Sequence, residues 1–383
     1  MNVAFQMTRI AAVLAIFVTT TLAQNNVLPT PKVGGLDVIR LERKATSGGK
    51  MLEFLSATLL PGRGMNMFQI TANIPGKGVT ELLQSPSLEE AAQQMTGTDK
   101  DTWGNASTSF GGAFLVPWIS RISGEMDADG QYLTAIWRDK KVKLPLNFQS
   151  KYSVHGLIRA AKVEELHTKK SAHGQIETGV IHAGNFNGHW FSETDIHFTI
   201  ALMRDAVEAT IVATNVGKEA EPMGAGWHPY FAIPSGDRSQ ARLHIPGHLR
   251  SVVDTDGLTT GELQPVQNTP FDFTAPNGAL LPENLLANFS RLDRERGSAD
   301  AWLSDPKSNY GIRVRAMSPG IKTFTIYAPK DRTAVAIEPQ LNFPDPFGKE
   351  WKNMDTGMVV LEPGQSATWK VRLELFSTQA GNR

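Results

Sequence analysis

The chain of 383 residues contains no cysteine. This absence excludes disulfides, thiolate nucleophiles and cysteine metal sites. It does not identify the cellular compartment, because exported proteins of this size can fold without disulfides. The chain also lacks an excess of charge, with 38 basic and 38 acidic residues and no polybasic run. We therefore expect no nucleic-acid partner.

Several catalytic signatures are also missing. No glycine-rich phosphate loop follows a strand pattern, which counts against a nucleotide cofactor. The Gly-x-Ser-x-Gly motif of many serine hydrolases is absent, as is His-Glu-x-x-His. His182, His189 and His197 do not have strong metal-ligand spacing. We expect no cofactor and no metal centre, and a structural cation held by oxygen ligands stays open.

One hydrophobic run stands out, at residues 10–22. It follows a start with a single positive charge at Arg9 and ends in Thr-Leu-Ala before Gln24. This layout predicts a signal peptide over residues 1–23 and a periplasmic or secreted protein with no membrane attachment after cleavage. The alternative is an uncleaved anchor, although 13 residues are fewer than the roughly 20 that a membrane span needs.

The rest of the chain is dominated by an apolar–polar alternation with period two, which is typical of half-buried strands. Residues 367–375 alternate almost without a break after a Pro-Gly turn, and residues 205–216 and 311–316 behave similarly. Strands are also predicted at 36–42, 51–60, 67–74, 132–137 and 299–306. The content of 34 glycines and 22 prolines suits many turns.

A single short helix is predicted over residues 88–95, because Ser87 and Glu90 form a capping-box pattern. No alternation of strands and helices indicates a parallel sheet. We therefore predict an all-β fold, a large antiparallel β-sandwich formed by one domain over residues 24–383.

The segment Gly-Trp-His-Pro-Tyr-Phe at 226–231 holds the first candidate for chemistry. Pro229 restricts the backbone beside His228, and the aromatic neighbours could form a wall that stacks on a sugar. This pattern makes His228 a candidate proton donor or acceptor. An aromatic corner of the core explains the same residues equally well.

The second candidate is Glu338, which follows an apolar run and precedes Pro339. Burial at the end of a strand would raise the pKa of this carboxyl group and make it a usable base near neutral pH. The alternative is a strand-end glutamate that faces water.

The third candidate is the group His155, Gly156 and Arg159. A histidine and an arginine four residues apart could bind sugar hydroxyls, and the glycine would let the backbone approach a ligand. A solvated loop is an alternative of equal weight.

Taken in order, these segments resemble the aldose 1-epimerase (galactose mutarotase) family over roughly residues 35–377. The resemblance is carried by the glycine-rich segment 110–122, His155-Gly156 with Arg159, and the His-Pro-Tyr-Phe segment. It is also carried by 254–262 with 269–273 and by the Glu-Pro motif in 335–340. The resemblance implies a galactose mutarotase-like supersandwich.

The same resemblance implies an activity, the interconversion of the α and β anomers of an unphosphorylated aldose. Glu338 would take the proton of the C1 hydroxyl while His228 gives one to the ring oxygen, and closure on the other face would reverse the roles. His155 would bind near the ring oxygen or C1, and Arg121 would hold a ring hydroxyl. A monosaccharide is then the expected partner, and the protein is expected to be a monomer or a homodimer.

The sequence departs from the family pattern in places. Ser120 stands where relatives often have asparagine, and Trp227 and Pro229 replace the asparagine and threonine of well-known galactose mutarotases. These changes put galactose specificity in doubt. The substrate-binding aspartate of the family falls near Asp293, with Asp300 as a rival. Asp293 is favoured because residues 299–306 resemble a strand and turn.

Three other functions stay open on the sequence. A hexose-phosphate epimerase of the same fold would need an arginine or lysine cluster at the far end of the sugar. A non-catalytic carbohydrate-binding protein would keep the sandwich without using the acid–base pair. A polysaccharide lyase or glycosidase on a similar sandwich usually has a longer chain.

Overall fold

The computed structural model describes residues 30–46, 48–172 and 174–379, and the predicted signal peptide lies outside these ranges. From Pro31 onward the chain forms one compact unit. In the described ranges, no helix combines the length and apolar character required for a membrane span.

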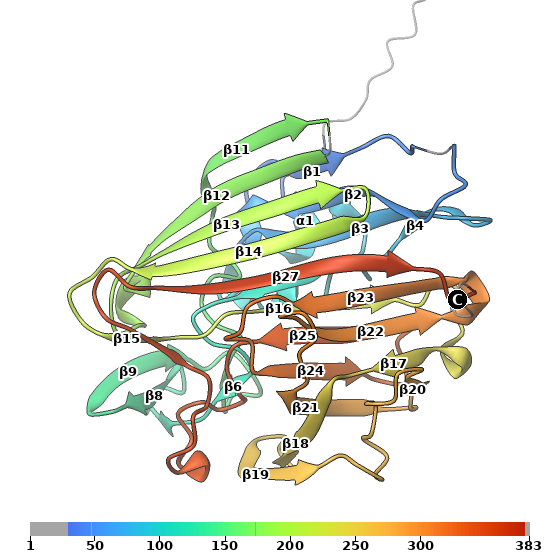
Figure 1. Ribbon diagram of the computed structural model, residues 1–383. Helices are drawn as coiled ribbons and strands as arrows, with labels where there is room; N and C mark the ends of the chain where they lie inside the picture. Colours follow the sequence, from blue (N-terminus) through green and yellow to red (C-terminus); the bar gives the residue numbers. More distant parts are fainter. Residues whose placement is uncertain (1–29, 47, 173, 380–383) are drawn as a thin grey trace, which may run out of the picture. The chain divides into compact units, whose positions relative to one another are not determined.

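The largest layer of this unit is a nine-stranded antiparallel sheet, which faces the viewer in Figure 1. Long alternating segments form its centre, so that one face is apolar and the other polar. In spatial order its strands are β11 (Glu164–Ser171), β12 (Gly174–Gly184), β13 (Thr194–Met203), β14 (Ala206–Asn215), β27 (Ser366–Phe376), β23 (Tyr310–Ala316), β22 (Ala299–Asp305), β17 (Arg242–His244) and β20 (Ala279–Leu280).

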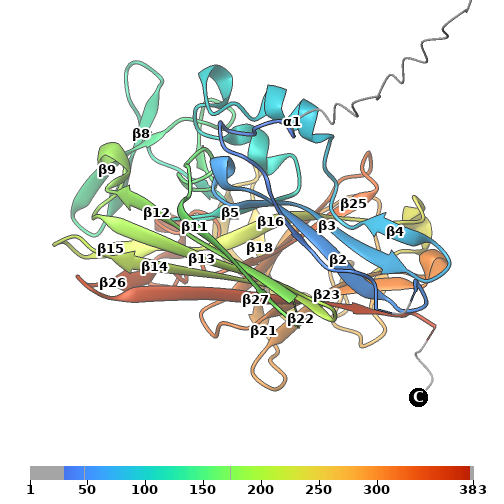
Figure 2. The ribbon, with the colours of Figure 1, turned by 90° about the horizontal axis from the view of Figure 1, so that it is seen from above.

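A seven-stranded antiparallel sheet and a four-stranded one form a second layer (Figure 2). The seven strands are, in spatial order, β19 (Thr259–Pro265), β18 (Gly247–Val253), β21 (Leu285–Leu292), β24 (Thr323–Ala328), β25 (Ala334–Gln340), β16 (Gly226–Ala232) and β5 (Gly112–Leu115). The four are β1 (Ile39–Glu42), β2 (Glu53–Leu60), β3 (Asn66–Ile74) and β4 (Gly78–Glu81).

Smaller elements complete the described unit. The short sheets pair β6 (Arg121–Ile122) with β10 (Ser153–Val154), β15 (Glu221–Met223) with β26 (Val359–Leu361), and β7 (Glu125–Met126) with β8 (Tyr132–Trp137) and β9 (Lys140–Pro145). The helices are α1 (Leu88–Gln94) and the 3-10 turns Pro61–Arg63, Asp99–Asp101, Asn105–Thr108, Phe186–Gly188, Arg238–Gln240, Pro306–Ser308 and Lys349–Trp351.

The core lies between the two layers and is rich in aromatic rings. Phe114 of β5 packs against Trp227 of β16, with ring centroids 6.1 Å apart. The same ring reaches across to Phe198 of β13 at 5.7 Å and Trp369 of β27 at 6.0 Å. These four side chains are at most 1% exposed, so they join the nine-stranded sheet to the seven-stranded one. Large buried aromatic surfaces of this kind dominate core energetics.

The all-β prediction is confirmed, and the predicted capped helix is α1, which ends at Gln94, one residue before the predicted end. The Ser87 side chain accepts a hydrogen bond from the Glu90 N–H, and the Glu90 carboxylate accepts one from the Ser87 N–H. The predicted strand over 367–375 is β27, whose side chains alternate between buried and exposed along most of its length. The strand predicted over 36–42 begins only at Ile39.

Candidate active site

The pairing of β16 with β25 places the two main candidates side by side. Gly226 lies opposite Gln340 and Tyr230 opposite Ala336, so this antiparallel register puts His228 opposite Glu338. Successive side chains of a strand point to opposite faces. The odd-numbered neighbours of both residues therefore enter the core, as seen for buried Trp227, Phe231, Val335 and Ile337. His228 and Glu338 share the other face.

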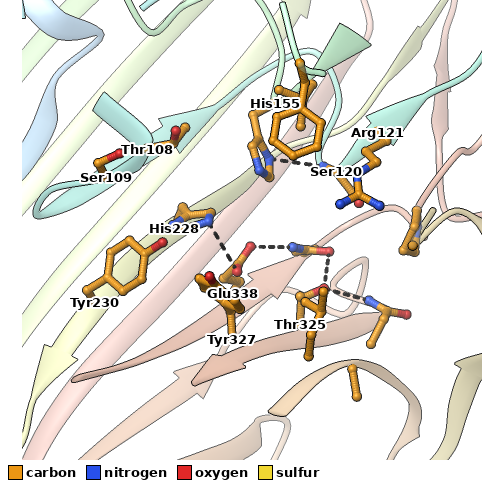
Figure 3. A pocket seen from close by; sticks show the side chains of 18 of the residues that line it. Thr108, Ser109, Ser120, Arg121, His155, His228, Tyr230, Thr325, Tyr327 and Glu338 are labelled. Carbon is orange, nitrogen blue, oxygen red and sulfur yellow. Dashed lines mark hydrogen bonds and ion pairs between the residues drawn. The ribbon is translucent and has the colours of Figure 1, made fainter. Parts of the chain in front are cut away.

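That face lines a cavity of about 540 Å³ in the described structure (Figure 3). His228 Nε2 lies 3.5 Å from Glu338 Oε1 at the cavity wall. His228 is 7% exposed and Glu338 is 2% exposed. The sequence left open whether Glu338 faces water, and the structure shows that it does not. The sequence also left open whether the segment around His228 is a corner of the core. The aromatic neighbours Trp227 and Phe231 do lie in the core, but His228 itself borders the cavity.

Burial shifts the protonation of both groups. Loss of solvation raises the pKa of Glu338 to about 8, and the hydrogen bond from Gln340 opposes this rise. Loss of solvation also lowers the pKa of His228 to about 4. Between these values the pair carries one proton in total, and in the free protein that proton resides on Glu338. One donor and one acceptor are thus available together at neutral pH.

A chain of hydrogen bonds behind Glu338 fixes its orientation (Figure 3). Gln340 Nε2 donates to Glu338 Oε2 at 2.9 Å, and Thr325 Oγ1 donates to Gln340 Oε1 at 3.1 Å. Asn288 Nδ2 donates to Thr325 Oγ1 at 2.9 Å, and Ser251 Oγ donates to Asn288 Oδ1 at 3.1 Å. These hydrogen bonds define which atom of each side-chain amide is the nitrogen and which is the oxygen. They leave Glu338 Oε1 free to face His228 and the cavity.

His155 is held across the cavity from β16 by Ser120. The Ser120 N–H donates to His155 Nδ1 at 3.2 Å, and the His155 N–H donates to the Ser120 carbonyl at 3.0 Å. Because Nδ1 accepts, the neutral ring carries its proton on Nε2. Both residues have left-handed backbones, with φ of 64° at Ser120 and 62° at His155. Such strained conformations cluster at functional sites.

The His155 ring meets the His228 ring edge to face, with centroids 5.1 Å apart. Burial is the main reason why the pKa of His155 lies well below its usual value, and the neighbouring His228 and the guanidinium of Arg159 lower it further. His155 is therefore a neutral hydrogen-bond donor at the cavity.

Arg121 lies at the cavity rim, because β6 pairs with β10 and Arg121 is opposite Val154. Its Nη1 donates to the Asp256 carbonyl at 2.8 Å, and its guanidinium lies 4.9 Å from the centre of the Phe148 ring. The loop that carries Asp256 belongs to segment 254–262, which the sequence had linked to the family. This contact explains how that segment reaches the site: it positions Arg121 through its backbone.

The structure brings His228, Glu338, His155 and Arg121 together but leaves Asp293 apart. Asp293 does not line the cavity; its carboxylate is exposed and lies 2.6 Å from His248 Nε2. Its rival Asp300 lies on β22 in the other sheet and forms an ion pair with Arg315 at 3.2 Å. Neither aspartate is placed to touch a ligand beside the His228–Glu338 pair.

The departures beside His228 also have a structural explanation. Trp227 points into the core, and its Nε1–H donates to the Gly112 carbonyl at 2.9 Å. Pro229 alternates with it on the same side of the strand and does not line the cavity. The side chains at these two positions therefore lie on the core side of β16 and do not form part of the cavity surface.

Sequence reasoning missed several residues of the cavity wall. Gln340 and Tyr230 could have been found, since each lies two positions from a candidate on the same strand face. Arg332, Thr325 and Asn288 gave no sequence signal, because strand pairing and loop packing bring them to the site. The described residues contain no cluster of three or more acidic or histidine side chains that could hold a metal ion.

Comparison with solved structures finds proteins of the same fold. A galactose mutarotase-like protein of Clostridium acetobutylicum has a TM-score of 0.70 at 19% identity, covering 89% of this chain and 99% of its own. A putative aldose 1-epimerase of Escherichia coli K12 has a TM-score of 0.64 at 18% identity, covering 89% and 100%. At these identities the similarity establishes a shared fold.

Sequence comparison adds two findings. The uncharacterised protein YphB of Escherichia coli K12 is 26% identical over 184 residues, a stretch that covers 45% of this chain and 57% of that protein's length. The sequence profile described as Aldose 1-epimerase matches residues 72–374, which is well over half of the chain and includes all four residues that meet at the cavity. The chain belongs to the aldose 1-epimerase family.

Proposed function

We propose that the protein is a mutarotase that interconverts the α and β anomers of an unphosphorylated aldose. The observation that carries this proposal is the His228–Glu338 pair, buried at a cavity wall with 3.5 Å between its reactive atoms. The C1 hydroxyl and the ring oxygen of a hemiacetal are bonded to the same carbon. A catalyst that moves protons at both oxygens therefore needs two proton-transfer groups side by side, which this pair supplies.

In the proposed reaction, the Glu338 carboxylate accepts the proton of the C1 hydroxyl and the protonated His228 donates its proton to the ring oxygen. The bond between C1 and the ring oxygen breaks, and the free aldehyde forms. Rotation about the C1–C2 bond presents the other face of the aldehyde. The C5 hydroxyl then attacks C1, His228 recovers its proton from that hydroxyl, and Glu338 returns a proton to the aldehyde oxygen.

The resting protonation of the pair is compatible with this cycle. Burial leaves the shared proton on Glu338 in the free protein, which is the state that follows ring opening. Transfer of that proton across the 3.5 Å gap to His228 gives the state that opens the ring. Both states hold the same number of protons, so no exchange with solvent is required in a turnover. Each proton-transfer group typically accelerates such a step about 10²- to 10⁴-fold.

The other site residues bind the sugar in this proposal. His155 Nε2–H is an oriented neutral donor that can hold the ring oxygen or the C1 oxygen, since Nδ1 is fixed by Ser120. Arg121 can donate to a ring hydroxyl from the rim through the guanidinium N–H groups that do not donate to the Asp256 carbonyl. No cofactor takes part in the reaction.

The test is mutarotation of freshly dissolved α-glucose and α-galactose, followed by polarimetry or NMR at several enzyme concentrations. We expect wild type to accelerate equilibration, and Glu338→Gln or His228→Ala to lower kcat at least 100-fold. Glu262→Gln is a matched control, because Glu262 is also a strand carboxylate hydrogen-bonded by a glutamine two residues later, but outside the cavity.

Two outcomes would contradict the proposal. Unchanged activity in Glu338→Gln, with a thermal midpoint equal to that of wild type, would remove the assigned base. Sugar binding by calorimetry with no acceleration of mutarotation for any aldose would instead favour a carbohydrate-binding protein without catalysis.

A further inference from the structure

The charged side chains that line the cavity are unevenly distributed. They comprise three arginines, Arg121, Arg159 and Arg332, and one carboxylate, Glu338. Burial keeps Glu338 protonated at neutral pH, because it raises the pKa of this group to about 8. The chain as a whole has 38 basic and 38 acidic residues, so the excess of positive charge is a local property of this cavity.

Among the three arginines that line the cavity, Arg332 makes the fewest polar contacts with the described residues. Its guanidinium lies 4.7 Å from the centre of the Tyr230 ring, and Tyr230 in turn lies 5.1 Å from the His228 ring. Nη1 of Arg332 is buried, and it has no hydrogen-bond partner among the described residues. A cation held over an aromatic ring beside the reactive pair, with a buried N–H group that has no partner in the described residues, is preorganised for a ligand.

The other two arginines differ from Arg332. Arg121 already donates to the Asp256 carbonyl, and the nearby carboxylates of Asp254 and Asp256 offset part of its charge. Arg159 is 1% exposed and donates through Nη2 to the Val154 carbonyl at 2.8 Å. Its Nε and Nη1 are buried without hydrogen-bond partners in the described structure, and the carboxylate of Asp101, which pairs with Arg63, offsets only part of its charge.

We propose that the natural aldose is a sugar acid, and that Arg332 binds its carboxylate while Arg159 contributes attraction from behind the site. This inference rests on the proposed mutarotase function and names the substrate class of the same site. Buried guanidinium N–H groups without hydrogen-bond partners are costly, and a bound anion that accepts from them relieves that cost. A neutral sugar offers only weak acceptors to the unpartnered N–H groups of these two arginines.

A carboxylate fits this geometry better than a phosphate. The planar guanidinium of one arginine matches a planar carboxylate with two acceptor oxygens. A phosphate dianion presents three acceptor oxygens and would need several free donors around it, whereas Arg121 is engaged at the rim next to Asp254 and Asp256. The expected substrate is therefore a hexuronate, with a free anomeric centre at C1 and a carboxylate at C6.

The experiment compares mutarotation of glucuronate, galacturonate, glucose and glucose 6-phosphate by NMR, in wild type, Arg332→Gln and Arg138→Gln. Arg138 is the matched control, because it lies 4.4 Å from the centre of the Trp137 ring but does not line the cavity. We expect wild type to have a higher kcat/KM for a uronate than for glucose. Arg332→Gln should lower the uronate-to-glucose ratio of kcat/KM about 10- to 100-fold, and Arg138→Gln should leave it unchanged.

The failures of the two proposals are distinguishable. Turnover of glucose with no preference for uronates, or a ratio that Arg332→Gln does not change, overturns the sugar-acid inference and leaves the mutarotase intact. A preference for glucose 6-phosphate over both uronates overturns the carboxylate assignment. If no sugar is turned over, the mutarotase proposal fails, and calorimetry decides the inference: glucuronate binding that Arg332→Gln weakens supports it, and absent or unchanged binding overturns it.

Discussion

Gln340 donates a hydrogen bond of 2.9 Å to Glu338, the residue two positions before it on the same face of β25. The contact occupies Oε2 and leaves Oε1 toward His228. It also stabilises the charged form of a carboxylate that burial would otherwise keep protonated to still higher pH. A short-range strand contact therefore sets both the direction and the acidity of the proposed base.

Replacing Gln340 with leucine tests this positioning role. Loss of the donor should raise the pKa of Glu338, since the hydrogen bond lowers it. The alkaline limb of kcat/KM against pH should therefore move to higher pH, and kcat should fall. Gln264→Leu is the control, because Gln264 donates to Glu262 at 2.8 Å in the same i to i−2 geometry on an exposed strand. A lower kcat with an unshifted limb would contradict the role.

The pH profile of wild type should be bell-shaped. Below a pH of about 4 both His228 and Glu338 are protonated, so no base remains. Above a pH of about 8 both have lost their protons, so no acid remains. Because the groups touch, the two apparent pKa values belong to the pair. Initial rates between pH 3.5 and 9.5 check this, and activity that keeps rising above pH 9 would refute it.

The double variant His228→Ala with Glu338→Gln should be little worse than either single variant. Groups that act as one unit show strong non-additivity, because removing either one already abolishes their joint contribution. We expect each single change to lower kcat at least 100-fold and the second change to lower it less than about 10-fold further. Losses that multiply fully would indicate two independent roles.

Gly156 should be intolerant of a side chain. Its φ is 70°, and an added Cβ would lie 2.2 Å from the Val116 carbonyl oxygen. Gly130 has a similar φ of 64° with no atom within 4 Å of its Cβ position. Gly130→Ala should cost about 1 kcal/mol from backbone strain alone, and Gly156→Ala about 3 kcal/mol or more with displacement of His155. Urea unfolding of both variants measures the difference, and equal costs would contradict the clash.

Glu221 is expected to make stability depend on pH. It is fully buried, it accepts hydrogen bonds only from Thr194 Oγ1 among the described residues, and burial raises its pKa to about 7. The folded state therefore retains this proton between pH 4.5 and 7 while the unfolded state loses it. The contribution of Glu221 is fully present below pH 4.5 and is lost as pH rises through 7, by on the order of 3 kcal/mol.

Glu221→Gln should remove that slope. The measurement is the free energy of unfolding in urea at pH 4.5, 6 and 8, compared between wild type and variant, so that other titrating groups cancel. The variant should gain stability relative to wild type as pH rises. A constant difference between the two proteins across the range would show that Glu221 titrates alike in both states.

Much of the fold could be predicted because period-two patterns report which face of a strand is buried. The alternation in β27 and β14 was visible in the sequence. The same alternation puts His228 and Glu338 on a shared face once β16 and β25 are known to pair. The pairing of β16 with β25 could not be predicted from the sequence, since it depends on contacts between segments about 110 residues apart.

The site was harder to predict where loops and non-local packing determine the position of a side chain. Asp293 was chosen by its place in a family pattern, but the β18–β21 end of the sheet carries it to the surface beside His248. Arg332 reaches the cavity because it lies over Tyr230, a contact that no spacing in the sequence encodes. The alternation rule would have found Gln340, whose polar side chain faces the cavity from a strand that is buried throughout.

The place of β27 has a consequence for how the protein can be made. This strand pairs with β14 on one side and β23 on the other, although more than 150 residues separate it from β14 in the chain. Until residues 366–376 have been synthesised, both neighbours expose an unpaired edge, and such edges invite association with other chains. A nonsense mutation between positions 339 and 365 would therefore yield an aggregating fragment, even though the reactive pair has already been translated.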